Sequence, residues 1–145
     1  MDESGRTVDR PAGSPRTALK WSISPEAMRF GLVQLHERYG LPLYVSENGQ
    51  ACNDRIFLDG KVHDADRIDY LARYITAMRA AMDEGVPVKG YYHWSLMDNF
   101  EWHSGYDERF GLVFVDYADN CRRIKKDSYF WYASLCKTGK LPETV

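Results

Sequence analysis

Hydrophobic positions along the chain recur at helical spacing in three segments. The first follows Ser24, Pro25 and Glu26, a helix-start pattern, and carries its apolar stripe at Met28, Leu32, Leu35 and Tyr39. We expect Ser24 to be the N-cap and Gly40 to end this helix. The second helix is predicted over residues 64–84, before Gly85, with apolar positions at Ile68, Leu71, Ile75, Met78 and Met82. The third covers residues 127–137 and has aromatic residues on one side.

Two short apolar runs alternate with these helices. Residues 41–45 and 86–94 are rich in β-branched and aromatic side chains, which predicts two buried parallel strands. The order helix, strand, helix, strand, helix indicates an α/β fold. Residues 110–117 read as a further extended segment, and Asp59-Gly60 within residues 56–62 predicts a small hairpin.

Composition places the chain among ordinary globular proteins. It has 145 residues, 44% of them hydrophobic and 28% charged, with a net charge of −2. Neither nucleic acid nor a membrane is favoured as a partner, because the chain is not basic and no apolar run is long enough to span a bilayer. Residues 1–20 contain Pro11, Gly13 and Pro15 and are predicted to be a loop or disordered, whereas residues 21–145 form one α/β unit.

Cysteine usage and the first residues bear on location and cofactors. Cys52, Cys121 and Cys136 are an odd number without metal-type spacing, and the polar segment 1–16 lacks the apolar core of a signal peptide. We therefore expect a cytoplasmic protein with no disulfide framework, no metal and no cofactor.

Glu47 is the first candidate for chemistry. It follows a predicted parallel strand and precedes Asn48-Gly49, and active sites of parallel α/β folds gather at the carboxyl ends of strands. The alternative is a glutamate that caps the turn or pairs with an arginine.

The second candidate is the segment 91–102, which follows the next strand. Its two tryptophans, Trp94 and Trp102, lie close in sequence to Glu101. Flat rings that pack on pyranose faces, together with carboxylates that bind hydroxyl pairs, are what a sugar site requires. The alternative is a packed aromatic loop, with His93 as a structural histidine and no second histidine at ligand spacing.

Three motifs together resemble family 1 glycoside hydrolases, chiefly β-glucosidases. They are Ser-Glu-Asn-Gly at residues 46–49, Trp-Ser-Leu-Met-Asp-Asn-Phe-Glu-Trp at 94–102, and Gly-Tyr-x-x-Arg-Phe-Gly-Leu at 105–112. The resemblance covers roughly residues 15–140. It implies that Glu47 is the catalytic nucleophile and that the sugar is held by Trp94, Glu101, Trp102 and Phe110. It also implies a cis peptide bond between Trp94 and Ser95.

The resemblance further implies a substrate class and an incomplete barrel. Relatives that act on 6-phosphorylated sugars have a serine where Glu101 stands, so we expect unphosphorylated β-D-glucosyl or β-D-galactosyl substrates. The family's acid/base lies in an Asn-Glu-Pro motif that these 145 residues do not contain. A (β/α)₈ barrel takes about 250 residues.

We therefore expect the C-terminal part of a barrel, about helix six to helix eight, whose partner is the missing N-terminal part. Such a chain should be inactive alone. A non-catalytic sugar-binding protein and a structural remnant stay open as alternatives.

Overall fold

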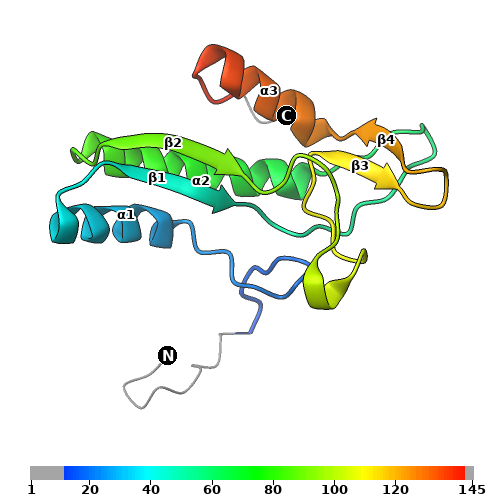
Figure 1. Cartoon of the computed structure of the whole chain (residues 1–145), viewed down its shortest axis with the longest axis horizontal. Coiled ribbons are helices and arrows are strands. Elements are labelled where there is room, and N and C mark those ends of the chain that lie inside the picture. Colours follow the sequence, from blue (N-terminus) through cyan, green and yellow to red (C-terminus); the bar gives the residue numbers. More distant parts are fainter. Residues whose placement is uncertain (1–11, 143–145) are drawn as a thin grey trace.

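The computed structural model describes residues 12–142 (Figure 1). Along the chain the elements are α1 (Glu26–Tyr39), β1 (Leu43–Asn48), α2 (Ala65–Asp83), β2 (Val88–His93), the short 3₁₀ helix η1 (Trp102–Ser104), β3 (Val113–Asp116), β4 (Arg122–Lys125) and α3 (Asp127–Thr138). The three predicted helices are present within two residues of their expected bounds. Residues 12–20 contain no helix or strand beyond an isolated bridge between Arg16 and Ser22. The rest of the predicted N-terminal loop, residues 1–11, lies outside the described residues.

β1 and β2 pair in parallel, which confirms the predicted α/β alternation. In their register Leu43 lies opposite Val88, and Asn48 lies opposite His93. The carboxyl ends of the two strands therefore meet at the same edge, as they do in larger parallel sheets.

The core lies between the helices and one face of this pair. One cluster joins Leu32 of α1, Val45 of β1 and Ala81 of α2. A second cluster joins Leu71 and Ile75 of α2 to Trp131 of α3 and to Leu112. α2 is thus the central helix, and it packs against both of the others.

The prediction that both strands are buried is wrong for the chain as it stands. Val45 is the one buried residue of β1, and β2 has none. Tyr44 and Tyr92 are exposed at 61% and 59%. The reason is that this parallel sheet has two strands only within the described residues, so neither outer edge of the pair has a neighbouring strand.

Three local predictions also differ from the structure. Pro25, not Ser24, occupies the cap of α1, and no side chain caps this helix. Asp59-Gly60 does form a turn, in which the Phe57 amide donates to the Lys61 carbonyl at 2.8 Å, but no strands flank it. The extended segment 110–117 contains β3, which pairs antiparallel with β4, a strand that was not predicted.

Within residues 12–142, no helix combines the length and apolarity that crossing a membrane requires.

Candidate active site

Asn48 connects the ends of β1 and β2. The Tyr91 hydroxyl donates to Asn48 Oδ1 at 2.8 Å, and Asn48 Nδ2 donates to the Tyr70 hydroxyl at 3.2 Å. The amide of Trp94 donates to the Asn48 carbonyl at 3.0 Å. These bonds fix the residue that follows Glu47 relative to the start of the loop after β2.

Gly49 allows this close approach of the two strand ends. A Cβ atom at position 49 would lie 1.9 Å from the Trp94 carbonyl oxygen, so any side chain there would displace the loop. The peptide bond between Trp94 and Ser95 is cis, as expected from the motif.

A pocket of about 570 Å³ lies at this edge of the strand pair. All five residues predicted for the site line it: Glu47, Trp94, Glu101, Trp102 and Phe110. Four further residues complete the lining: Trp21, Asn48, Gly49 and Tyr70. Glu47 is exposed and forms no ion pair with any residue in the range 12–142.

Glu101 is held in the pocket by one side-chain hydrogen bond and by backbone hydrogen bonds to η1 and Gly105. Trp94 Nε1 donates to Glu101 Oε1 at 3.0 Å, and the Glu101 amide donates to the Gly105 carbonyl at 2.6 Å. Trp102 follows in the left-handed region, with φ 45°, and its side chain is 82% exposed. The result is one carboxylate with an indole on each side, a set of groups able to stack on a ring and bind its hydroxyls.

Aromatic residues from other elements close the pocket. Phe110 is buried, and its ring lies 6.1 Å from that of Trp21. Tyr70 of α2 stacks on Tyr74 with the ring centroids 4.1 Å apart, and burial raises the pKa of its hydroxyl. The sequence reasoning did not assign Trp21 or Tyr70 to the site. Trp21 lies outside the three motifs, and nothing distinguished Tyr70 from an ordinary helix residue.

His93 has a structural role, which agrees with the simpler interpretation. Its Nε2 lies 3.3 Å from the Phe110 carbonyl, so the neutral ring donates there. Burial, reinforced by the charge of Arg67, lowers the pKa of His93 to about 4. At neutral pH it is uncharged and cannot provide a cation to the pocket.

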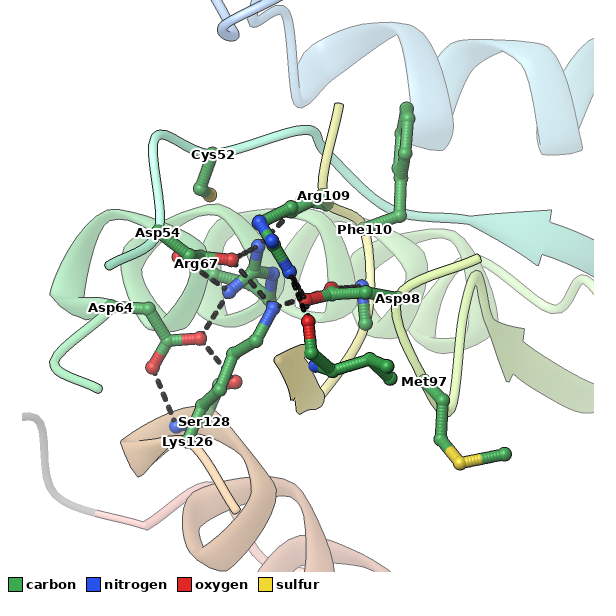
Figure 2. Close-up of polar contacts among 12 residues, drawn as sticks. Cys52, Asp54, Asp64, Arg67, Met97, Asp98, Arg109, Phe110, Lys126 and Ser128 are labelled. Atoms are coloured by element: carbon green, nitrogen blue, oxygen red, sulfur yellow. Dashed lines mark hydrogen bonds and ion pairs between the residues drawn. The ribbon is translucent and has the colours of Figure 1, made fainter. Parts of the chain in front are cut away.

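Behind the pocket lies a buried ionic network that the sequence reasoning missed (Figure 2). It consists of three carboxylates and three cations, Asp54, Asp64, Asp98, Arg67, Arg109 and Lys126. Their formal charges cancel, which buried ions require because unpaired charges are costly away from water. These residues come from the β1–α2 loop, α2, the β2–β3 loop and the residue before α3, so the network ties together most of the chain.

The contacts within this network are short charge-assisted hydrogen bonds. Lys126 Nζ lies 2.7 Å from Asp98 Oδ1 and also contacts Asp54 Oδ2 at 2.5 Å. Arg67 Nη2 donates to Asp54 Oδ2 at 2.7 Å and to the Arg109 carbonyl at 2.8 Å. The last contact reaches the residue before Phe110, so the network supports the pocket wall directly.

The fold and the pocket together define the class: an α/β protein with a carboxylate- and tryptophan-lined pocket at the ends of its parallel strands. The sequence profile of glycosyl hydrolase family 1 matches residues 2–141, and the chain belongs to this family.

Relatives and solved structures agree with that assignment. The chain is 51% identical over 127 residues to a bifunctional β-D-glucosidase/β-D-fucosidase of Bifidobacterium breve, covering 84% of this chain and 27% of that protein. It is 48% identical over 130 residues to β-glucosidase A of Thermotoga maritima, covering 89% and 29%. A structure of the Thermotoga maritima β-glucosidase in complex with glucoimidazole superposes with a TM-score of 0.86 at 48% identity, over 90% of this chain and 29% of that one.

The chain therefore spans less than a third of these relatives. The family also includes a protein with a different substrate, a 6-phospho-β-galactosidase of Clostridium acetobutylicum, 40% identical over 139 residues, or 94% of this chain and 29% of that protein.

Proposed function

We propose that this chain supplies the nucleophile and part of the sugar subsite of a retaining β-glycosidase. In this proposal its elements correspond to helix six through helix eight of a (β/α)₈ barrel. The observation that carries the proposal is that Glu47, Trp94, Glu101, Trp102 and Phe110 line one pocket. Catalytic groups of such barrels lie at the carboxyl ends of the strands, where this pocket is found.

Glu47 acts as the nucleophile in this proposal. One of its carboxylate oxygens attacks the anomeric carbon, and the bond to the aglycone oxygen breaks as that oxygen receives a proton. Water then attacks the glycosyl-enzyme ester and releases the sugar with its configuration retained. The proton donor is a second carboxyl group, about 5–5.5 Å from the first in such enzymes. We propose that a segment outside these 145 residues provides it.

Glu101 binds a pair of sugar hydroxyls, and the two tryptophans flank the ring. The carboxylate of Glu101 would repel a phosphate group at the same position. We therefore propose an unphosphorylated β-D-glucosyl or β-D-galactosyl substrate, and not the class for which the clostridial relative is named. The names of the bacterial β-glucosidases support this choice.

The proposal is tested in a chimera in which this chain replaces the aligned segment of Thermotoga maritima β-glucosidase A, which we call the Thermotoga chimera. An activated 2-deoxy-2-fluoro-β-glucoside should form a stable ester on Glu47, detected by peptide mass spectrometry. The Glu47→Gln chimera is the matched control and should remain unlabelled. A label on Glu101 instead would refute the assignment.

Rescue by an external nucleophile provides a second test of Glu47. Glu47→Gly in the Thermotoga chimera should abolish hydrolysis, and added azide should restore part of the turnover by occupying the vacated space. The alternative of a sugar-binding protein without catalysis is favoured by the lack of an Asn-Glu-Pro motif in these residues. It predicts that the 145-residue chain alone binds a glycone analogue.

A further inference from the structure

The pocket residues that follow β2 belong to one long loop whose two ends lie side by side. The Leu112 amide donates to the Ser95 carbonyl at 3.0 Å, and the Val113 amide donates to the Leu96 carbonyl at 3.0 Å. The Ser95 amide in turn donates to the Phe110 carbonyl at 3.2 Å. Trp94 and Phe110 are thereby held next to each other, and Glu101 and Trp102 lie on the excursion between them.

Asp98 holds this closure from inside. Its side chain is fully buried and accepts four hydrogen bonds, from Arg109 Nη1 at 2.6 Å, Lys126 Nζ at 2.7 Å, the Gly111 amide at 3.0 Å and the Val115 amide at 3.3 Å. Its own amide donates to the Val113 carbonyl at 3.0 Å. Three of the four donors belong to the returning end of the loop or to β3. This one carboxylate therefore joins the first part of the loop to its last part.

The packing around Asp98 leaves no space for adjustment. A Cβ at Gly111 would lie 2.2 Å from the Asp98 amide nitrogen, so the two backbones are as close as a glycine permits. Lys126, also fully buried, connects Asp98 to Asp54 and through it to Arg67 of α2. Figure 2 shows the Lys126 ammonium between the Asp54 and Asp98 carboxylates. Buried ion pairs therefore connect the loop to the central helix α2.

We propose that Asp98 is a positioning residue for the sugar subsite, acting through the loop closure to hold Trp94 and Glu101 at hydrogen-bonding distance. The inference rests on the proposed function for the meaning of the subsite. Asp98 touches none of the residues assigned to hold sugar and transfers no proton. Asp98 fixes the positions of the Trp94 indole and the Glu101 carboxylate before a ligand binds. Less side-chain conformational entropy is then lost on binding.

Asp64 provides a matched control for this role. It is likewise a fully buried carboxylate in the same network, bonded to Arg67, to the Ser128 amide at 2.9 Å and to the Ser128 hydroxyl at 2.5 Å. These contacts lie between α2 and α3 and include no residue of the loop after β2. Asp64 reaches the loop only indirectly, through Arg67, so replacing it should affect the pocket less than replacing Asp98 does.

The deciding measurement is the indole N–H resonance of Trp94 in the 145-residue chain, assigned with Trp94→Phe. In Asp98→Asn this resonance should shift upfield, since the hydrogen bond to Glu101 lengthens or is lost. In Asp64→Asn the shift should be clearly smaller than in Asp98→Asn. Lys126→Gln is a second variant that removes a single donor to Asp98, and it should produce a smaller shift in the same direction. An unshifted Trp94 resonance in folded Asp98→Asn, or an equal shift in Asp64→Asn, would overturn the proposal.

This readout needs neither activity nor ligand, so it can fail or succeed independently of the glycosidase proposal. In the Thermotoga chimera, Asp98→Asn should raise KM for 4-nitrophenyl β-glucoside on the order of tenfold, the effect of misplacing one charge-assisted hydrogen bond. The pH profile of kcat should keep both limbs. Loss of one limb would mean that Asp98 takes part in proton transfer, which contradicts a positioning role.

Discussion

At the scale of single residues, the two carboxylates of the pocket, Glu47 and Glu101, have different surroundings. Glu47 is exposed at the end of a strand and has no ion-pair partner within the described range. Glu101 instead accepts a hydrogen bond from the Trp94 indole through one carboxylate oxygen, Oε1. A carboxylate already committed in this way is suited to hold hydroxyls in a fixed geometry, whereas an unpaired one is suited to attack.

Replacing Glu101 by alanine in the Thermotoga chimera should therefore weaken sugar binding. One or two charge-assisted hydrogen bonds would be lost, at about 1.5–3 kcal/mol each. If they tighten in the transition state, kcat falls together with kcat/KM in steady-state assays. Glu101→Gln is the control for proton transfer, and its pH profile should retain both limbs. A missing limb would assign acid or base chemistry to Glu101 and remove it from the binding set.

At the scale of elements, His63 joins the turn at residues 57–61 to the start of α3. Its Nδ1 lies 2.6 Å from Asp127 Oδ2, its Nε2 lies 3.0 Å from Asp59 Oδ2, and its ring packs edge-on against Phe57. The hydrogen bond to Asp127, followed by that to Asp59, raises the pKa of His63 above its usual 6.5. His63 thus stabilises the first turn of α3, and it binds Asp127 and Asp59 more tightly when it is protonated.

The stability of the chain should therefore depend on pH through His63. Because its folded pKa is raised, the stabilisation is fully present below the unfolded value of 6.5 and is lost as pH rises through the folded value. Thermal unfolding between about pH 5 and pH 8 should show wild type losing its advantage over His63→Gln as pH increases. A constant difference in Tm across that range would show that His63 contributes by packing alone.

Periodicity predicted the helices well because apolar residues recur on one face of each. In α2, Leu71 and Ile75 of that face are buried, whereas in α1 Leu32 is the one buried residue. Periodicity missed β4, since the residues of this strand, Arg-Arg-Ile-Lys, are charged and largely exposed and lack the apolar pattern of a buried strand. The lining of the pocket by Glu47 and Glu101 was found from motifs after strand ends. The ionic network was not, because its members are far apart in sequence and each alone resembles a surface charge.

At the scale of the whole molecule, the strand pair is the least complete part of the structure. Isolated two-stranded sheets are marginal, and open parallel edges invite association. The helices cover one face, while Tyr44 and Tyr92 lie exposed on the strands. The network and the two apolar clusters hold the helices and loops together, but they do not replace neighbouring strands.

The isolated 145-residue chain should accordingly show no measurable β-glucosidase activity. Without a general acid the aglycone leaves unprotonated, and such catalysis is typically worth about 10²–10⁴-fold. The assay uses purified chain with 4-nitrophenyl β-glucoside, and Glu47→Gln gives the background. Turnover above that background would show that the chain is self-sufficient, for example by assembling with copies of itself.

The distribution of tryptophans has a spectroscopic consequence. Three of the four, Trp21, Trp94 and Trp102, line the same pocket, whereas Trp131 is buried in the second cluster at 7% exposure. Fluorescence of the chain is therefore dominated by indoles in contact with water at one site. Any molecule that fills this pocket changes their emission, while the single buried indole reports on the intact core, so occupancy and folding can be followed separately without an added dye.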